Sequence, residues 1–316
     1  MASGNHTTTP GFVLLGFSNL TNLQGLLFVV FLVIYMVILL GNGVIVLVTV
    51  LDSALQTPMY FFLGNLSFVE ICYSSVTLPK MLASCLAEDG SISFTGCAAQ
   101  MYFFLLLAGT ECFLLTAMAY HRYVAICNPL RYTLIVNREI CATMVAGSWL
   151  VSILLHFGQT YLVFSLPFFG SHEINHFFCD VPPLLELSCV DTYRNKMVIF
   201  MAVLLFLIIP FFLIVISYIK IARTILKIPS AQGRQKAFST CSSHLIVVAL
   251  FYGTIMIVYM VPKSGTLRAL NKVFSLFYTV LTPLANPLIY SLRNREVKEA
   301  LINTVRRAVT LTKNPN

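Results

Sequence analysis

Hydrophobic residues dominate seven long runs along this chain, and the runs lack the regular exchange of buried and exposed positions that marks a soluble fold. Each run is about 20 to 26 residues long, enough for a helix rising about 1.5 Å per residue to cross a hydrocarbon core of about 30 Å. The pattern predicts an all-α membrane protein, a seven-transmembrane helix bundle. The predicted spans are residues 26–51, 58–79, 98–120, 140–163, 197–219, 238–261 and 272–292.

The two ends of the chain differ from these runs. Residues 1–25 begin with a polar stretch rich in Thr and Asn, so we expect an extracellular tail ahead of the bundle at 26–292. In residues 293–316, apolar side chains recur at helical spacing beside Arg306 and Arg307. This arrangement predicts a short amphipathic helix on the inner membrane face, followed by a cytoplasmic tail.

Charge is scarce and unevenly placed. Charged residues make up 10% of the chain and the mean hydropathy is +0.85, whereas soluble domains carry about 25% charged residues. With the N-terminus outside, fourteen of the 20 Lys and Arg residues fall on the cytoplasmic side, as the positive-inside rule requires. We therefore expect a multi-pass protein of the plasma membrane. Its excess of basic residues is consistent with contact to membrane lipid or to an acidic partner. Nucleic-acid binding is not needed to explain this excess.

The predicted outer surface carries candidate covalent features. Asn5 starts an Asn-His-Thr sequon in the outer tail and is a candidate glycosylation site. Four of the nine cysteines fall on the outer side, where disulfides persist. Pairing Cys97 with Cys179 would pin the long outer loop over the bundle. The alternative is four free thiols, with Cys85 and Cys189 as the other two.

The same loop contains HEINH, His172 to His176, which matches the zinc-protease pattern H-E-x-x-H. That chemistry needs a helix, so that both imidazoles share one face. Proline and glycine bracket the motif, and no third ligand is indicated. We interpret it as a polar loop with some helical character and predict no enzymatic activity.

Two acidic residues, Glu70 and Glu111, fall midway along the second and third spans. A charge at the bilayer centre costs about 2.5–3.5 kcal/mol on insertion scales, and such residues face the bundle interior. Two bare carboxylates would repel each other, so they suggest a shared sodium ion or a shared proton, with Asn42 and Asn286 at similar depth. The alternative is a polar contact that holds helices together. We expect no other cofactor.

Several short motifs occur in order at matching depths. They are GN at 41–42, PMYFFLGNLSFVE at 58–70, MAYHRYVAIC at 118–127, SY at 217–218, KAFSTCSSHL at 236–245 and PLANPLIYSLRN at 283–294. Together they resemble olfactory (odorant) receptors of the rhodopsin-like G-protein-coupled family, over about residues 10 to 308. The opening LGFSNLTNLQGLLF and the stretch GRQKAFSTC resemble family 10.

The resemblance implies a receptor that binds a small volatile odorant and activates a stimulatory heterotrimeric G protein, raising cyclic AMP. It implies a disulfide between Cys97 and Cys179. Arg122 matches the family's arginine at the inner end of the third helix, and Tyr218 and Tyr290 match tyrosines that rearrange with it. The candidate set for G-protein coupling and activation is His121, Arg122, Tyr123, Tyr218, Lys236, His244, Tyr290 and Arg293.

The chain departs from the family pattern at three positions. His121 stands where an acid usually precedes the arginine, Glu70 replaces an Asp, and Phe169 replaces a loop cysteine. The last change leaves Cys189 either free or paired with Cys85. Without an acid beside Arg122, basal signalling is raised on one hypothesis. On the other, the acid matters little and His121 is tolerated.

The predicted ligand site lies in the outer halves of the third to seventh spans, where apolar residues follow helical spacing. Each position fits core packing equally well. No acid occurs in this region, which disfavours a charged amine ligand, while hydroxyl and imidazole groups suit an alcohol, aldehyde, ester or ketone. The candidates are Met101, Phe104, Leu105, Ala108, Gly109, His156, Ala202, Val203, Phe206, Tyr252, Ile255, Tyr259, Leu276 and Thr279.

Two other classes of membrane protein fit the sequence less well. A transporter of the common type would show internal repeats and interrupted helix pairs, and no repeat is evident. A channel would show a polar pore stripe or a filter loop, and neither is present. The sequence therefore favours a receptor.

Overall fold

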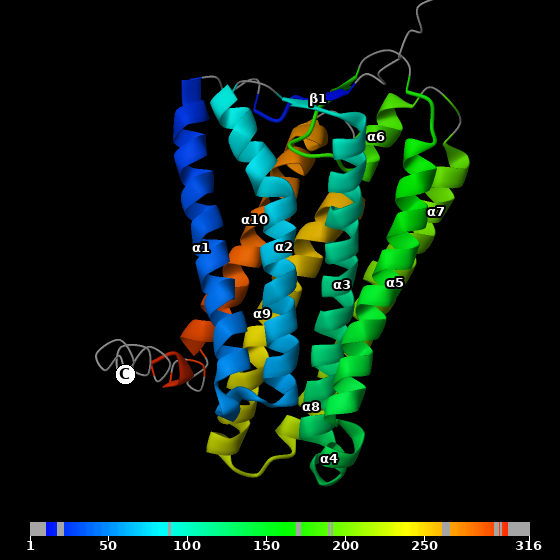
Figure 1. Cartoon of the computed structure of the whole chain (residues 1–316). Coiled ribbons are helices and arrows are strands. Elements are labelled where there is room, and N and C mark those ends of the chain that lie inside the picture. The colour runs from blue at the N-terminus through cyan, green and yellow to red at the C-terminus, as the bar shows by residue number, and fades with distance from the viewer. Residues whose placement is uncertain are drawn as a thin grey trace, which may run out of the picture.

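Seven long helices stand side by side in the computed structural model of this chain (Figure 1). The structure describes residues 11–17, 22–87, 90–168, 172–188, 190, 192–260, 266–293, 297 and 299–302. Within this part, the first four spans and the last two are single helices, and the fifth is composite. The single helices are α1 (Gln24–Leu51), α2 (Pro58–Ala87), α3 (Phe94–Cys127), α5 (Arg138–Phe164), α9 (Ala231–Met260) and α10 (Thr266–Arg293).

Two of the helices, α3 and α5, begin before the hydrophobic runs, where a capping side chain stabilises the first turn. Ser93 accepts a hydrogen bond from the backbone N–H of Gly96, 3.0 Å away, at the start of α3. Asn137 does the same for Ile140 at 2.8 Å, at the start of α5. Such caps satisfy N–H groups that the first helical turn leaves without partners. The predicted spans were correct in number and position but too short at several ends.

The fifth span consists of three segments: α7 (Tyr193–Val203), a π-helical turn (Leu204–Ile208) and α8 (Ile209–Leu226). Pro210 lies just after the π-helical turn. A proline inside a helix lacks the N–H donor and its ring crowds the carbonyl four residues earlier, so a wider turn relieves both problems. The turn also changes which side chains of this span face the bundle, which hydrophobicity alone does not predict.

A small sheet covers the outer end of the bundle. Its strands are β1 (Phe12–Leu14), β2 (Ser91–Ile92) and β3 (Glu173–Ile174), in the order β2-β1-β3. β1 is antiparallel to β2 and parallel to β3. Phe12 and Leu14 point inward and are buried. The sequence pattern did not predict the strand in the segment 1–25. One prediction was wrong: the HEINH motif contributes β3 instead of helical structure.

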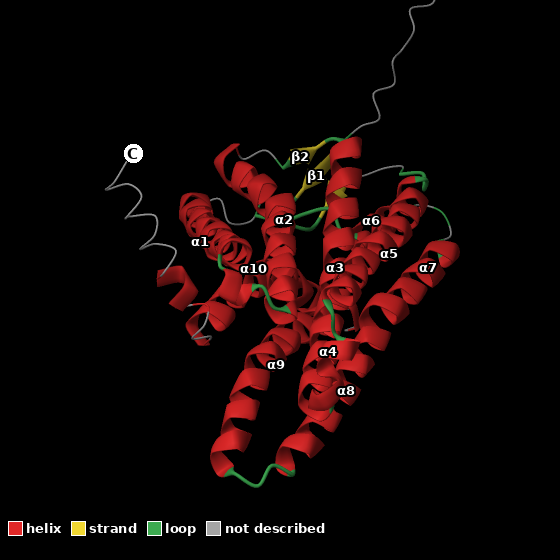
Figure 2. Ribbon diagram, turned by 60° about the horizontal axis from the view of Figure 1, so that its bottom comes forward, coloured by secondary structure: helices red, strands yellow, loops and turns green. Residues whose placement is uncertain are grey.

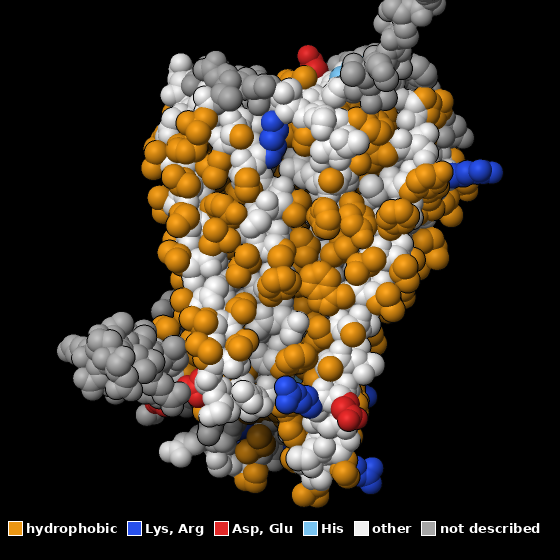
Figure 3. All heavy atoms as spheres, viewed as in Figure 1, with side chains coloured by type: hydrophobic (Ala, Val, Ile, Leu, Met, Phe, Trp, Pro, Cys, Tyr) orange, Lys and Arg blue, Asp and Glu red, His pale blue; other side chains and the backbone are white. Residues whose placement is uncertain are grey.

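Hydrophobic side chains cover the middle of the visible face, while charged ones appear mainly toward its two ends (Figure 3). The interior holds buried polar side chains, among them Asn42, Glu70, Thr110 and Glu111. Apolar outside and polar within is the arrangement expected for helices in lipid. Six described helices are long and apolar enough to cross a membrane, and α10 adds a shorter apolar stretch at Val273–Ile289. The chain is a multi-pass membrane protein with a seven-helix bundle.

The inner end is shaped by α8 and α9, which reach past the other helices in the tilted view (Figure 2). Between α3 and α5 lie a 3-10 turn (Pro129–Arg131) and the short helix α4 (Tyr132–Ile135). Residues 299–302 are helical, and Val297 and Ala300 are buried. The remainder of the predicted amphipathic helix lies outside the described residues.

Candidate functional site

A largely apolar cavity lies in the outer half of the bundle, between α3, α5, the fifth span and the loop helix α6 (Val181–Leu187). Its cavity volume is about 90 Å³, below the range of about 300–1,000 Å³ that is usual for drug-sized ligands, so it suits only a small molecule. Its lining residues are Phe104, Leu105, Ala108, Gly109, Cys112, His156, Gln159, Val181, Ile199, Ala202, Val203, Phe206, Leu207, Ile255 and Tyr278.

The structure brings most of the predicted ligand-site residues together around this cavity. Those that line it come from four spans whose apolar stripes converge at the same depth. They are Phe104, Leu105, Ala108, Gly109, His156, Ala202, Val203, Phe206 and Ile255. The side chain of Tyr259 lies outside the described residues.

Four predicted ligand-site residues are absent from the lining. Met101 packs in the hydrophobic cluster beneath the outer sheet. The ring of Tyr252 packs against the rings of Phe211 and Phe251. Leu276 packs on the main core, and Thr279 donates a hydrogen bond along its own helix to the carbonyl of residue 275, at 2.7 Å. Helical spacing alone could not separate these from cavity positions, because core packing and ligand contact favour the same stripe.

Six lining residues were not among the predicted ligand-site residues. Cys112 follows Ala108 by one turn on α3, so its spacing could have identified it. Gln159 stands out as a polar residue in an apolar run. Val181 reaches the cavity through the fold of the outer loop, and local sequence gives no signal for it. The others are Ile199, Leu207 and Tyr278.

His156 is the buried imidazole of the cavity, and its two nitrogens differ. Nδ1 lies 3.1 Å from Oε1 of Gln159, one turn along α5. Because that oxygen only accepts, Nδ1 carries the proton of a neutral imidazole, and Nε2 is then an acceptor. Nε2 is buried and has no hydrogen-bond partner among the described residues. The ring packs against Phe206 with centroids 4.4 Å apart.

Gly109 on α3 provides the space that this imidazole occupies. A Cβ atom at position 109 would lie 2.6 Å from Nε2 of His156 and 3.0 Å from the ring of Phe206. Both distances are shorter than a normal van der Waals contact, so any larger residue would displace the imidazole. The glycine therefore sets the position of the cavity's polar group.

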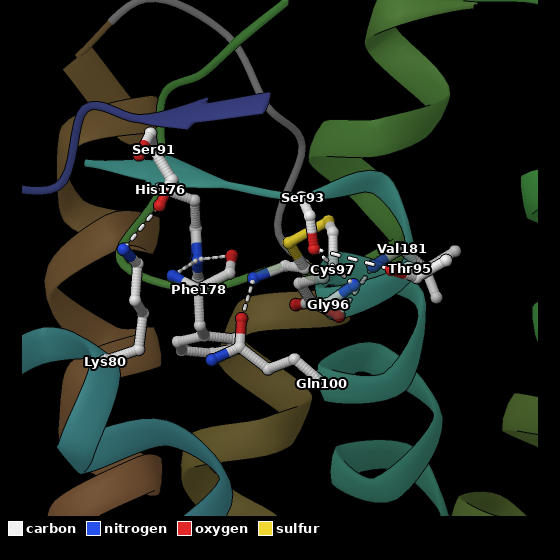
Figure 4. The surroundings of a disulfide bond; sticks show 12 residues. Lys80, Ser91, Ser93, Thr95, Gly96, Cys97, Gln100, His176, Phe178 and Val181 are labelled. Atoms are coloured by element: carbon white, nitrogen blue, oxygen red, sulfur yellow. Dashed lines mark hydrogen bonds between the residues drawn. A yellow bond between two sulfur atoms is a disulfide. The ribbon is translucent and has the colours of Figure 1, made fainter. Parts of the chain in front are cut away.

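The outer loop is fixed over the cavity by a disulfide between Cys97 and Cys179, with Cα atoms 5.5 Å apart (Figure 4). Oε1 of Gln100 accepts the backbone N–H of Cys179 at 3.0 Å, and its Nε2 donates to the carbonyl of Val76 at 3.1 Å. This anchoring places Val181 in the lining. The pairing implied by the family resemblance is confirmed, and Cys85 is a buried free thiol.

The HEINH motif has a structural role in the same region. His176 is buried, with Nδ1 3.0 Å from the carbonyl of Phe178 and Nε2 2.8 Å from the hydroxyl of Ser275 on α10. It thereby joins the loop to the seventh span. Across the described residues, no three His, Cys, Asp or Glu side chains are grouped to hold a metal ion.

A buried polar cluster lies below the cavity. Asn286 on α10 donates a hydrogen bond to the carboxyl group of Glu70 on α2. Glu111 on α3 faces the same carboxyl group, and both acids are fully enclosed. One carboxyl oxygen of each acid and the amide oxygen of Asn286 have no hydrogen-bond partner among the described residues. Asn42 on α1 donates to the carbonyl of Pro283 on α10 at 3.1 Å.

At the inner end, two histidines are hydrogen-bonded to tyrosines of other elements. Nε2 of His121 lies 2.7 Å from the hydroxyl of Tyr132 on α4. Nδ1 of His244 on α9 lies 2.7 Å from the hydroxyl of Tyr218 on α8. Burial raises the pKa of Tyr132 above its ordinary value, so its hydroxyl keeps its proton and can donate to the imidazole.

Arg122 is buried between these two contacts. It reaches the thiol of Cys241 on α9, and His244 lies close to it. The neighbouring Tyr123 carries Lys220 over its ring at 5.2 Å. The side chains of Lys236, Tyr290 and Arg293 lie outside the described residues, as do Asn5, Phe169 and Cys189.

Comparisons with known proteins agree with this geometry. A family model described as olfactory receptor matches residues 31–307. Human olfactory receptor 10A7 is 52% identical over 309 residues, 98% of each chain. Human olfactory receptor 10A3 is 53% identical over 311 residues, 98% of this chain and 99% of that one. Both names carry the number 10, the family that the stretches LGFSNLTNLQGLLF and GRQKAFSTC resemble.

A solved structure of squid rhodopsin shares the fold. Its TM-score is 0.74 at 17% sequence identity, and the match covers 92% of this chain and 82% of the rhodopsin chain. At that identity the likeness shows the arrangement of helices alone. The family match, which spans most of the chain, shows more: the chain belongs to the olfactory receptor family, the non-enzymatic receptors of the rhodopsin-like G-protein-coupled class.

Proposed function

We propose that the outer cavity binds small, mostly apolar volatile odorants and that binding activates a stimulatory heterotrimeric G protein, which raises cyclic AMP. The observation that carries the ligand part is the unpartnered Nε2 of His156, buried at the edge of an apolar cavity. An unsatisfied buried polar atom costs about 1–3 kcal/mol. A ligand that satisfies it regains that free energy on binding.

The state of His156 narrows the odorant class. With its Nδ1 proton directed at Gln159, Nε2 accepts and does not donate. An alcohol can donate its hydroxyl proton to Nε2, whereas a ketone or ester of the same shape brings a second acceptor and would repel it. The receptor therefore prefers hydroxyl-bearing odorants over carbonyl-bearing ones with the same carbon skeleton.

The coupling part of the proposal rests on the inner end. Arg122, His121, Tyr123, Tyr218 and His244 lie together where basic segments meet the cytoplasm. Arg122 is a fixed cation beside Cys241 and His244 of α9. The helices α8 and α9 reach furthest inward (Figure 2). Separation of α9 from α3 would expose the guanidinium to an acidic or carboxyl-terminal segment of the G protein. Lys236, Tyr290 and Arg293 complete the proposed surface.

We propose further that Glu70 and Glu111 share one proton or one sodium ion. The donor set fits either: three oxygens from two acids and an amide lack hydrogen-bond partners among the described residues. Two ionised carboxylates in contact would repel strongly away from water. One proton or one cation removes that repulsion, and its loss would loosen the contact between α2 and α3.

The proposed orientation places the N-terminus outside the plasma membrane, with Asn5 glycosylated. The disulfide supports it, because disulfides persist on the oxidising outer side, where Cys97 and Cys179 lie together. Loss of a glycan from Asn5→Gln at the cell surface tests the orientation. An unchanged gel mobility would contradict the assignment of this sequon.

Cyclic AMP measured in transfected cells tests the proposed function. An odorant panel should contain alcohol, ketone and methyl-ether members of each carbon skeleton, with the Arg122→Ala variant measured alongside. We expect responses to alcohols that Arg122→Ala abolishes at equal surface expression. Loss of a charged hydrogen-bonding partner typically costs about 2–5 kcal/mol, a potency loss of about 30-fold or more. A response retained in Arg122→Ala would overturn the coupling assignment.

A further inference from the structure

A second hollow opens on the lipid-facing side of the bundle, in its inner half, between α3, α5 and α8. Its volume is about 630 Å³. α3 packs along both other helices, while α5 makes its contacts with the fifth span mainly through α7. The inner parts of α5 and α8 therefore diverge, and α3 forms the floor of a groove between them. This groove is separate from the odorant cavity and from the polar cluster.

The walls of the groove are suited to a hydrocarbon chain. Its hydroxyl groups are already engaged along their own helices: Thr116 donates to Cys112, Ser148 to Met144, and Ser217 to Leu213, at 2.7–2.8 Å. The walls thus offer no unsatisfied hydroxyl donor at these three positions. A polar ligand would gain little binding free energy in this groove, whereas burial of apolar surface is favourable.

The length of the groove matches one membrane leaflet. On α3 it runs from Phe113 to Tyr123, about 15 Å at about 1.5 Å per residue. That is half of a hydrocarbon core of about 30 Å. The groove ends at Tyr123, beside the inner boundary marked by Arg122. An acyl chain entering from the cytoplasmic leaflet would fill it to the bilayer midplane.

The mouth of the groove carries a cation. Lys220 on α8 lines the groove and is exposed, with its ammonium group 5.2 Å from the ring centroid of Tyr123. The hydroxyl groups of Tyr120 and Tyr123 belong to the same end of the groove. The acid in the first turn of α5, Glu139, is next in sequence to the basic residue Arg138. The charge at the mouth therefore favours an anionic headgroup.

We propose that this groove binds an anionic phospholipid of the cytoplasmic leaflet, with one acyl chain lying along α3 and the phosphate group paired with Lys220. Bound there, the lipid would fill the space between α5 and α8. Activation that moves α8 would change the groove, so lipid occupancy would couple to signalling. The length, the apolar walls and the positive mouth each match this one occupant.

Native mass spectrometry of the purified full-length receptor tests the proposal. The receptor is incubated with phosphatidylserine and phosphatidylcholine of identical acyl chains, and the retained lipid is counted. We expect one preferentially retained phosphatidylserine. Lys220→Gln should lower that retention about fivefold, which corresponds to about 1 kcal/mol per basic side chain at an anionic surface. Arg223→Gln removes the same charge from the same helix outside the groove and should have a much smaller effect.

A second variant tests the groove itself. A Cβ atom at Gly147 would meet no atom within 4 Å, so Gly147→Leu can extend its side chain into the groove that Gly147 lines. Gly158 on the same helix is equally open but lies outside the groove, and Gly158→Leu is the matched control. We expect loss of phosphatidylserine retention in Gly147→Leu and none in Gly158→Leu.

Three outcomes would overturn the proposal. Equal losses in Lys220→Gln and Arg223→Gln would mean diffuse attraction to the whole basic face. Equal retention of the two lipids, or their displacement by a sterol, would mean that the headgroup is not recognised. Loss of a receptor dimer in Gly147→Leu, with lipid retention unchanged, would mean that a second copy of the chain occupies the groove.

Discussion

The outer and inner halves of this receptor use buried histidines in opposite ways. In the outer cavity, His156 bonds to Gln159 on its own helix and leaves Nε2 directed at space kept open by Gly109. At the inner end, His121 and His244 bond to tyrosines of other elements. A local partner leaves the outer imidazole available to a ligand, whereas distant partners make the inner ones cross-links between elements. Under the proposed function, this contrast assigns ligand recognition to His156 and conformational control to His121 and His244.

The largest expected effect on recognition comes from Gly109→Ala. The new methyl group would lie 2.6 Å from Nε2 of His156, so the imidazole must move from the cavity edge. Overpacking of this kind costs about 1–3 kcal/mol, which corresponds to a potency loss of about 5- to 150-fold for alcohol odorants. Dose–response curves for cyclic AMP measure it. Gly158→Ala makes the same change in open space and should leave potency unchanged; a similar loss there would indicate a general helix effect.

A smaller effect is expected from His156→Phe, which keeps a ring of similar shape and removes the acceptor. One hydrogen bond is worth about 0.5–1.5 kcal/mol, so potency for alcohols should fall about 2- to 13-fold. The matched methyl ethers cannot donate a proton and should be unaffected or improved. Equal losses for both ligand series would show that His156 acts through packing alone.

Where sequence reasoning succeeded, the relevant pattern was local. The seven spans follow from runs of apolar residues, and the α3 face at Phe104, Leu105, Ala108 and Gly109 follows from helical spacing. The position of Glu70 opposite Asn286 followed from depth, because charged groups in lipid have to face inward. These features need no knowledge of how distant segments meet.

Where it failed, tertiary contacts decided the outcome. Val181 reaches the cavity because Cys97 and Gln100 anchor a loop that lies 82 and 79 residues further along the chain, respectively. The strand Phe12–Leu14 forms because β2 and β3 offer unpaired edges over the bundle. The bond between His121 and Tyr132 joins α3 to a helix whose fold the apolar pattern does not show. None of these partners is specified by local hydrophobicity.

The inner cross-links should affect basal signalling more than ligand potency. Tyr218→Phe removes the hydroxyl that bonds His244 and leaves the ring, which stacks on the imidazole with centroids 5.7 Å apart. Loss of about 1 kcal/mol between α8 and α9 should raise ligand-free cyclic AMP about fivefold. Thr143→Val removes an exposed hydroxyl that bonds along its own helix, outside both the cross-link and the lipid groove, and is the matched control. Unchanged basal signalling in Tyr218→Phe would show that the bond between Tyr218 and His244 does not control activation.

The smallest expected effect concerns His121, where the family usually has an acid. On one hypothesis the missing acid raises basal signalling, and on the other His121 is simply tolerated. The hydrogen bond to Tyr132 joins His121 to α4. The loss of the acid and the gain of this bond should therefore nearly balance in their effects on basal signalling. We expect His121→Asp, which places a carboxylate beside Arg122, to lower basal cyclic AMP by about twofold, near the lower limit for one net hydrogen bond. Tyr132→Phe, which breaks the present link and adds no charge, should raise it by a similar factor. If Tyr132→Phe has no effect while His121→Asp silences the receptor, the link to α4 is structural and the missing acid alone sets the basal level.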